Sequence, residues 1–101
     1  MNTKYYIGFP LTKSSKSKTR SYHFVTDPSL PVVSAKGSVL TANPLTANER
    51  KALTFFDLDS ALEWCDANLD DFIMDNYTVD PNKYDWDNPV IIQNDFTIIP
   101  L

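Results

Sequence analysis

The chain has 101 residues, of which 43% are hydrophobic and 13% aromatic, so it has the material for one hydrophobic core and about one domain. Its single cysteine, Cys65, and single histidine, His23, exclude an internal disulfide framework and a zinc site built from several Cys or His ligands. No run approaches the roughly 18 apolar residues of a membrane helix, and the N-terminus lacks the apolar segment of a secretory signal. We therefore expect a soluble, cytoplasmic protein with no membrane partner.

Charge is divided unevenly along the chain. Residues 1–51 carry eight Lys or Arg against two Asp or Glu, a balance of +6, whereas residues 52–101 carry one lysine against eleven Asp or Glu, a balance of −10. This asymmetry indicates either an electrostatic partner or attraction between the two halves within one fold, although charged faces also simply keep a domain soluble.

Two strands are predicted near the N-terminus. TKYYIGF, residues 3–9, combines Tyr, Ile and Phe and stops at Pro10, while SYHFVTD, residues 21–27, alternates aromatic and smaller side chains. The Ser- and Lys-rich segment 11–20 between them is typical of a surface loop. Together these segments predict a hairpin with a basic tip.

The next two elements are short. Residues 31–42 have β-branched residues on either side of Lys36-Gly37, which predicts a bent strand or a tight hairpin. Thr46-Ala47-Asn48-Glu49 matches a capping box, in which the first and last side chains satisfy free backbone donors, and it predicts one or two turns of helix.

The main helix is predicted to start at a second capping box, Ser60-Ala61-Leu62-Glu63. At about 100° per residue, one side of this helix carries an apolar stripe that faces the core. The opposite side carries Glu63, Asp66 and Asp70, which share about 60° of arc and form an acidic edge. The members of the stripe are Ala61, Leu62, Trp64, Cys65, Leu69, Phe72 and Ile73.

Three C-terminal segments complete the pattern. Residues 71–79 fit a helical period and a strand period almost equally well, and residues 80–89 form a turn-rich loop. Residues 90–101 predict a final strand. The whole chain, residues 1–101, is therefore predicted to form one α+β domain, a small, mainly antiparallel sheet of four to five strands with one main helix packed on one face. The helix is expected to bury Leu62, Cys65, Leu69 and Phe72.

Signatures of catalysis are scarce. Cys65 lies near the middle of the apolar stripe, which favours a buried thiol over a nucleophile activated by His23. Asp57 and Asp59, one of several neighbouring carboxylate pairs, are explained by helix capping and the helix dipole. We predict no catalytic residues and no enzymatic activity.

No cofactor or metal site is predicted. Gly8 and Gly37 are the only glycines, and neither belongs to a phosphate-binding motif. The loop that starts at Asp80 has the oxygen-rich composition of a calcium loop, but it holds Asp85 where the turn needs glycine and Ile91 where a bidentate glutamate belongs, which excludes an EF-hand. An irregular cation site made of converging oxygens stays open.

The acidic surface gives the leading functional hypothesis. A row of short Asp side chains can resemble a nucleic-acid backbone and occupy the basic groove of a nucleic-acid-binding protein. Trp86, if exposed beside these charges, would supply an aromatic anchor. We predict a small acidic protein-interaction module, an inhibitor that mimics nucleic acid towards a basic protein partner, in keeping with the general composition of small phage-encoded inhibitors. The predicted partner-binding residues are Glu63, Asp66, Asp70, Asp71, Asp75, Asp85, Trp86 and Asp87.

Three alternatives remain open, and the first is a small enzyme that uses paired Asp carboxylates or Cys65 in a concave site. A basic cluster in the first loop can track a phosphate backbone, which predicts a nucleic-acid-binding module instead. In a homo-oligomer, the same loop of one subunit could contact the acidic edge of the next. The basic cluster consists of Lys13, Lys16, Lys18 and Arg20.

Overall fold

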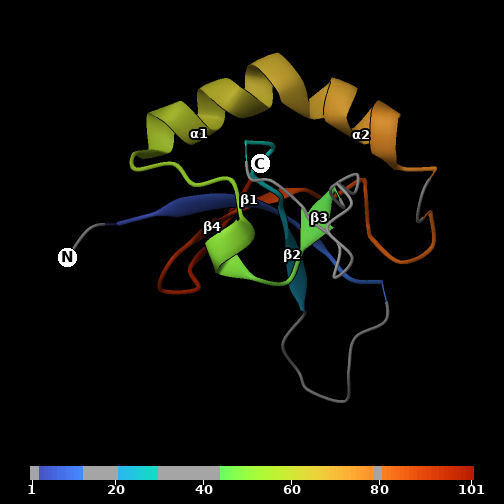
Figure 1. The fold of residues 1–101 in the computed structure, drawn as a ribbon, viewed down its shortest axis with the longest axis horizontal. Helices are drawn as coiled ribbons and strands as arrows, with labels where there is room; N and C mark the ends of the chain where they lie inside the picture. The colour runs from blue at the N-terminus through green and yellow to red at the C-terminus, as the bar shows by residue number, and fades with distance from the viewer. Residues whose placement is uncertain (1–2, 13–20, 30–43, 79–80) are drawn as a thin grey trace, which may run out of the picture.

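The computed structural model describes residues 3–12, 21–29, 44–78 and 81–101. A five-stranded sheet has the order β3-β2-β1-β4-β5, and all neighbouring strands are antiparallel. One long helical segment crosses a single face of this sheet (Figure 1). The predicted α+β fold, with one main helix on one face of a small antiparallel sheet, is therefore confirmed. The strands are β1 (Tyr5–Pro10), β2 (Tyr22–Val25), β3 (Leu45–Thr46), β4 (Val90–Gln93) and β5 (Ile98–Pro100).

The predicted N-terminal hairpin is present as the pair of β1 and β2. Gly8 lies opposite Phe24 and Phe9 lies opposite His23, and the Leu11 amide donates to the carbonyl of Ser21 at 2.9 Å. The basic tip of this hairpin and the element predicted over residues 31–42 lie outside the described residues.

Alternation along β1 and β2 divides the apolar side chains between the two faces of the sheet. Ile7, Phe9 and Val25 belong to the main core, which lies between the sheet and the helix. Tyr6 and Phe24 belong to a second, smaller cluster, and their rings lie 5.2 Å apart. The sheet therefore has a thick core under the helix and a thinner apolar layer on its other face.

The predicted final strand is instead a hairpin, so that prediction was wrong in detail. β4 and β5 pair with Ile91 opposite Ile99, and residues 94–97 between the two strands form the turn. The Asp95 side chain accepts a hydrogen bond from the Thr97 amide at 3.0 Å, and this local bond favours a turn over an extended chain.

The helical segment begins three residues earlier than predicted and runs to Asn76. Asp57 is its N-cap, and both carboxylate oxygens are used, accepting from the amide of Ser60 at 2.7 Å and from its hydroxyl at 2.9 Å. An earlier cap adds Leu58, which packs against the main core. The ambiguous residues after 70 are thus helical as far as Asn76. The segment consists of α1 (Leu58–Trp64), a π-helical turn η2 (Cys65–Leu69) and α2 (Asp70–Asn76).

The helix also faces the sheet differently from the prediction. Ala61 is fully buried, whereas Leu62 is 41% exposed, so the expected burial of Leu62 was wrong. The small Ala61 side chain lets the helix backbone approach the sheet closely, and that contact sets the rotation of α1. Leu62 follows at about 100° around the axis and so lies on the flank.

The helix predicted at residues 46–49 is a single 3₁₀ turn, η1 (Glu49–Lys51). Its cap is Asn48, whose side chain accepts from the Arg50 amide at 3.0 Å. Thr46 belongs to β3, and its hydroxyl accepts from the Asn48 amide at 3.1 Å. The predicted capping box was therefore wrong, because strand pairing of Thr46 moves the cap two residues along the chain.

Candidate binding surface

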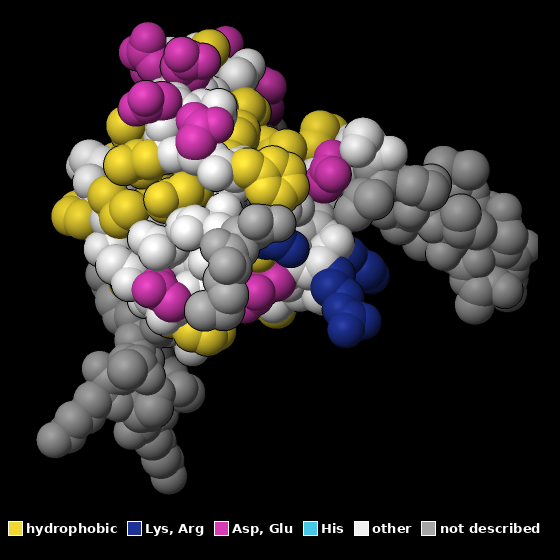
Figure 2. Space-filling model, turned by 90° about the vertical axis from the view of Figure 1, so that its left-hand side faces the viewer, with side chains coloured by type: hydrophobic (Ala, Val, Ile, Leu, Met, Phe, Trp, Pro, Cys, Tyr) yellow, Lys and Arg dark blue, Asp and Glu magenta, His cyan; other side chains and the backbone are white. Residues whose placement is uncertain are grey.

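The solvent side of the main helix is strongly acidic. All six of its carboxylates are exposed, and residues 52–82 contain no lysine or arginine. In the space-filling view, Asp and Glu side chains gather at the top of the molecule, over the helix, and the Lys and Arg side chains in view lie away from them (Figure 2). We call this surface the acidic helix face. Its members are Asp59, Glu63, Asp66, Asp70, Asp71 and Asp75.

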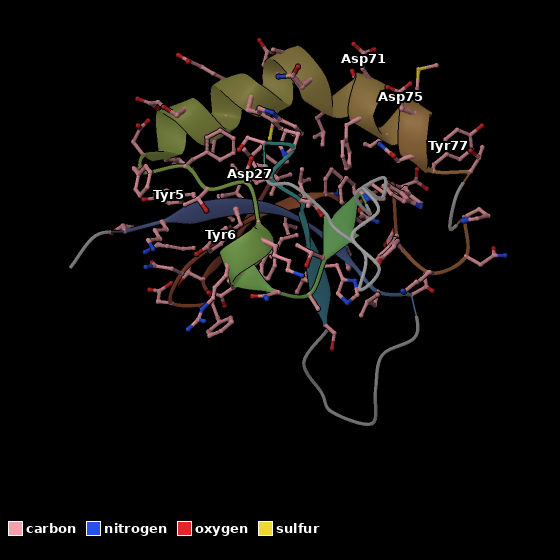
Figure 3. The ribbon with its side chains drawn as sticks, viewed as in Figure 1. Tyr5, Tyr6, Asp27, Asp71, Asp75 and Tyr77 are labelled. Atoms are coloured by element: carbon pink, nitrogen blue, oxygen red, sulfur yellow. The ribbon has the colours of Figure 1, made fainter. Side chains whose placement is uncertain are left out.

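The π-helical turn changes how these charges line up. A π turn takes about one residue more than an α turn, so residues beyond Leu69 are rotated by about 100° relative to an uninterrupted α-helix. The predicted arc of Glu63, Asp66 and Asp70 assumed that uninterrupted helix, and Asp70 no longer continues it. Asp71 and Asp75 take its place, and both project from the outer side of α2, away from the sheet (Figure 3).

The same turn keeps the apolar side of the helix on the core. Leu69 is buried, while Phe72 and Ile73 pack partly buried against the main cluster. The side-chain amide of Asn68 donates to the Trp64 carbonyl at 3.3 Å, next to the point where the regular α-helical pattern is interrupted. The turn therefore serves both faces, because it realigns the apolar stripe and the outer charges together.

Exposed apolar side chains accompany the charges. Leu62, Met74 and Tyr77 are all exposed, on α1, on α2 and just after α2. Large apolar groups rimmed by polar ones are a feature of protein interaction surfaces. Tyr77 is an exposed aromatic residue just beyond α2, and sequence reasoning did not select it because its exposure depends on where the helix ends.

The predicted aromatic anchor, Trp86, is not on this surface. It is only 8% exposed, and its ring lies 4.9 Å from that of Phe9 and 6.4 Å from that of Phe72. Trp86 therefore belongs to the core between α2 and β1 and does not have the exposure that the predicted anchor role requires. The loop that contains Trp86 is held at the end of β1, because the amide of Asp85 donates to the Pro10 carbonyl at 2.8 Å.

The loop contributes less to the acidic surface than predicted. Asp87 is exposed, but Asp85 is half-buried and accepts a hydrogen bond from the Asn88 side-chain amide at 2.8 Å. That bond holds the carboxylate of Asp85 within its own turn. Of the loop residues predicted to bind a partner, Asp87 is the one whose side chain is exposed.

Cys65 and His23 have separate environments. Burial raises the pKa of the Cys65 thiol to about 11, so at neutral pH it is protonated and a poor nucleophile. The Nδ1 atom of His23 lies 2.7 Å from the hydroxyl oxygen of Tyr84, so the imidazole shares a hydrogen bond with a phenol. Neither group has the surroundings of an activated catalytic residue.

His23 is expected to make stability depend on pH. Burial, and then the positive charge of Lys83, lower the pKa of His23, so folding favours its neutral form. In the unfolded chain the pKa of His23 returns to about 6.5, so below that pH the unfolded chain binds more protons than the folded chain does. The free energy of unfolding should therefore have its full value above a pH of about 6.5. It should decrease as the pH drops from there towards the lowered pKa of folded His23. Urea denaturation at several pH values should show this decrease in the free energy of unfolding. The variant His23→Asn has no titrating group at this position, so its decrease should be smaller. Parallel pH curves for the two proteins would contradict the assignment of the decrease to His23.

The remaining predictions concern metal binding, membrane helices and the basic cluster of the first loop. Within the four described ranges, no three His, Cys, Asp or Glu side chains converge as metal ligands. No helix in the described part of the chain is long and apolar enough to cross a membrane. The four basic residues of the alternative hypothesis, from Lys13 to Arg20, lie outside the described residues.

Comparisons with protein-family models, with curated proteins and with solved structures find no match to this chain.

Proposed function

We propose that this protein is a non-enzymatic interaction module that binds the basic surface of a partner protein through the acidic helix face. The observation that supports this proposal is the uninterrupted run of exposed carboxylates along one helix, with no lysine or arginine between residues 52 and 82. Exposed Leu62, Met74 and Tyr77 beside the charges add apolar area that a bound partner can cover.

Charge spacing supports mimicry of nucleic acid. Six carboxylates are distributed over the 19 residues of the helical segment, which at 1.5 Å per residue is about 28 Å long. This gives one negative charge per roughly 5 Å, compared with one per about 3.4 Å along a single strand of DNA. The helix therefore carries a lower but comparable density of negative charge, with Asp70 displaced from the row of the other carboxylates, on a rigid element instead of a flexible loop.

Such a line of charge acts chiefly on the rate of association. Exposed charges attract an oppositely charged groove over about a Debye length, close to 8 Å at physiological ionic strength. They raise the association rate and select against acidic partners, while the apolar contacts slow dissociation. Binding should consequently weaken as salt is added. An inhibitory role follows where the occupied groove is the partner's own nucleic-acid site.

The test is an affinity capture from nuclease-treated lysate with two matched variants. Asp71→Asn with Asp75→Asn removes two charges from the acidic helix face, and Glu49→Gln with Asp95→Asn removes two charges from residues outside the helix. The Asn at position 95 retains the oxygen that accepts from the Thr97 amide. We expect the first variant to capture at least about tenfold less of a basic partner protein than the second variant does. Duplex DNA should elute that protein from the native form.

Two results would contradict the proposal. Equal loss of capture in both variants would mean that only net charge matters, and unchanged capture in both would exclude the acidic helix face as the binding surface. Circular dichroism of each variant verifies that it remains folded before capture is compared. Adding Asp87→Asn to the native chain then determines whether the loop belongs to the same surface.

A further inference from the structure

The face of the sheet opposite to the helix contains a hollow of about 630 Å³. The hollow lies among β2, η1 and the β4–β5 hairpin. Tyr6, labelled next to η1 in Figure 3, belongs to the apolar cluster on the same face of the sheet. Small-molecule sites have volumes of about 300–1,000 Å³, apolar linings and a few polar groups. The residues that give this hollow its chemistry are Tyr22, Phe24, Glu49, Ile92, Phe96 and Ile98.

The floor of the hollow is preformed. Phe24 and Ile92 are buried members of the smaller apolar cluster, and both are held in paired strands. Tyr22 and Ile98 are partly exposed at its sides. A ligand entering here therefore contacts side chains whose backbone is already fixed, which reduces the ordering cost of binding.

Phe96 occupies a strained backbone position beside this floor. It has φ of 68°, in the left-handed region that a bulky residue rarely adopts and that favours glycine. The Phe96 amide donates to the Gln93 carbonyl at 2.8 Å, and the Gln93 amide donates to the Thr97 carbonyl at 2.9 Å. This is a tight hairpin loop in which the third loop residue is commonly glycine. Phenylalanine costs folding energy here, yet its ring is 71% exposed, so burial in the free protein does not repay that cost.

Glu49 gives the hollow a negative side. It lies at the start of η1, whose position is set by the Asn48 cap, and its side chain is partly exposed. Glu49 is among the residues that line the hollow. Burial and, to a lesser degree, the charge of Glu49 raise the pKa of Tyr6 on the same face of the sheet. The neighbouring cations, Arg50 and Lys51, are exposed and are not among the described residues that line the hollow.

We propose that this hollow binds a small organic cation with an aromatic or branched apolar body. The ammonium group pairs with the carboxylate of Glu49, and the apolar body packs on Phe24, Ile92 and the ring of Phe96. Aromatic rings around an ammonium group add cation–π attraction, which neutral or anionic ligands do not receive. Strain at Phe96 is then offset only when a ligand covers its exposed ring.

A matched series of probes tests the proposal on the full chain. Phenethylamine, phenethyl alcohol and phenylacetate share an aromatic body and differ in charge. Titration into ¹⁵N-labelled protein should shift the amide signals of residues such as Ser21, Phe24 and Ile98, with the amine binding at least about tenfold more tightly than the alcohol and the acid binding least. Shifts confined to the helix would place the amine on the acidic helix face and overturn the proposal, as would equal affinity for amine and alcohol or no binding of any probe.

Two variants separate the charge from the ring. Glu49→Gln should reduce amine affinity about tenfold and leave the alcohol unchanged. Phe96→Gly relieves the positive φ, so the protein should stay folded with an unchanged or higher melting temperature, while affinity for both probes falls about tenfold. Retention of amine binding in either variant would contradict the assignment. The variant Asp71→Asn with Asp75→Asn should bind the amine normally, so this result and that of the partner capture can fail independently.

Discussion

Replacing Trp86 with alanine is expected to lower the free energy of unfolding by about 3–5 kcal/mol. The side chain is 8% exposed and packs against three aromatic rings, with centroid distances of 4.9 Å to Phe9, 5.5 Å to Tyr84 and 6.4 Å to Phe72. Truncation leaves a cavity between α2 and β1 that these large rings cannot collapse to fill. Because small domains are stable by only about 5–15 kcal/mol, the variant should be close to its unfolding threshold.

Urea denaturation followed by far-ultraviolet circular dichroism measures this effect. Tyr77→Ala is the matched control, since it also removes an aromatic ring but from an exposed position just beyond α2, and it should cost no more than about 1 kcal/mol. If Trp86 were the surface anchor that the loop sequence suggests, Trp86→Ala would instead leave stability nearly unchanged. Equal midpoints for Trp86→Ala and the native protein would therefore overturn its place in the core.

Introducing glutamate at neighbouring positions of α1 should have opposite consequences. Ala61 is fully buried at the contact between helix and sheet, so Ala61→Glu places an unpaired carboxylate in the core and should cost several kcal/mol, enough to unfold much of the protein. Leu62 is 41% exposed, so Leu62→Glu should cost about 1 kcal/mol or less. The two variants carry the same charge one residue apart.

Thermal melting of both variants determines the rotation of the helix. A large loss for Ala61→Glu with a small loss for Leu62→Glu is expected from the observed burial, and large losses in both variants would restore the rotation that the sequence period predicts, in which both residues lie on the apolar stripe. The comparison at pH 7 and pH 4, made relative to the native protein at each pH, adds a further test. Protonation of a buried glutamate should reduce the stability deficit of Ala61→Glu at pH 4 and leave the deficit of Leu62→Glu unchanged.

The apolar hollow and the acidic helix face lie on opposite sides of the same sheet. Acidic side chains project from the helix, while the hollow lies among β2, η1 and the β4–β5 hairpin. A partner on the helix and a small cation in the hollow can therefore bind at the same time. Any coupling between them would have to cross the sheet, where alternate side chains of β1, β2 and β4 belong to the two apolar clusters.

Local patterns in the sequence determined the class of fold and the location of most elements. The alternation of Tyr22 and Phe24 with His23 and Val25 predicted a half-buried strand, and that pattern is physical because successive side chains point to opposite faces. Recurrence of apolar residues every three or four positions predicted a helix on the sheet. The acidic character of the helix was equally predictable from the sequence, because the identity of its Asp and Glu residues does not depend on the fold.

Only the tertiary structure decided which of these side chains are available at the surface. Trp86 follows Asp85 and Tyr77 follows Asn76, both in polar stretches, yet Trp86 fills the core and Tyr77 is exposed. Burial of Trp86 depends on contacts with β1 and α2, which the local sequence does not reveal. The π-helical turn moved Asp71 and Asp75 into the place expected for Asp70, since realigning the apolar stripe on the sheet stabilises more than regular helical bonding does. The hollow beside Phe96 was equally inaccessible to sequence reasoning, because it is formed by three segments that only the folded sheet brings together.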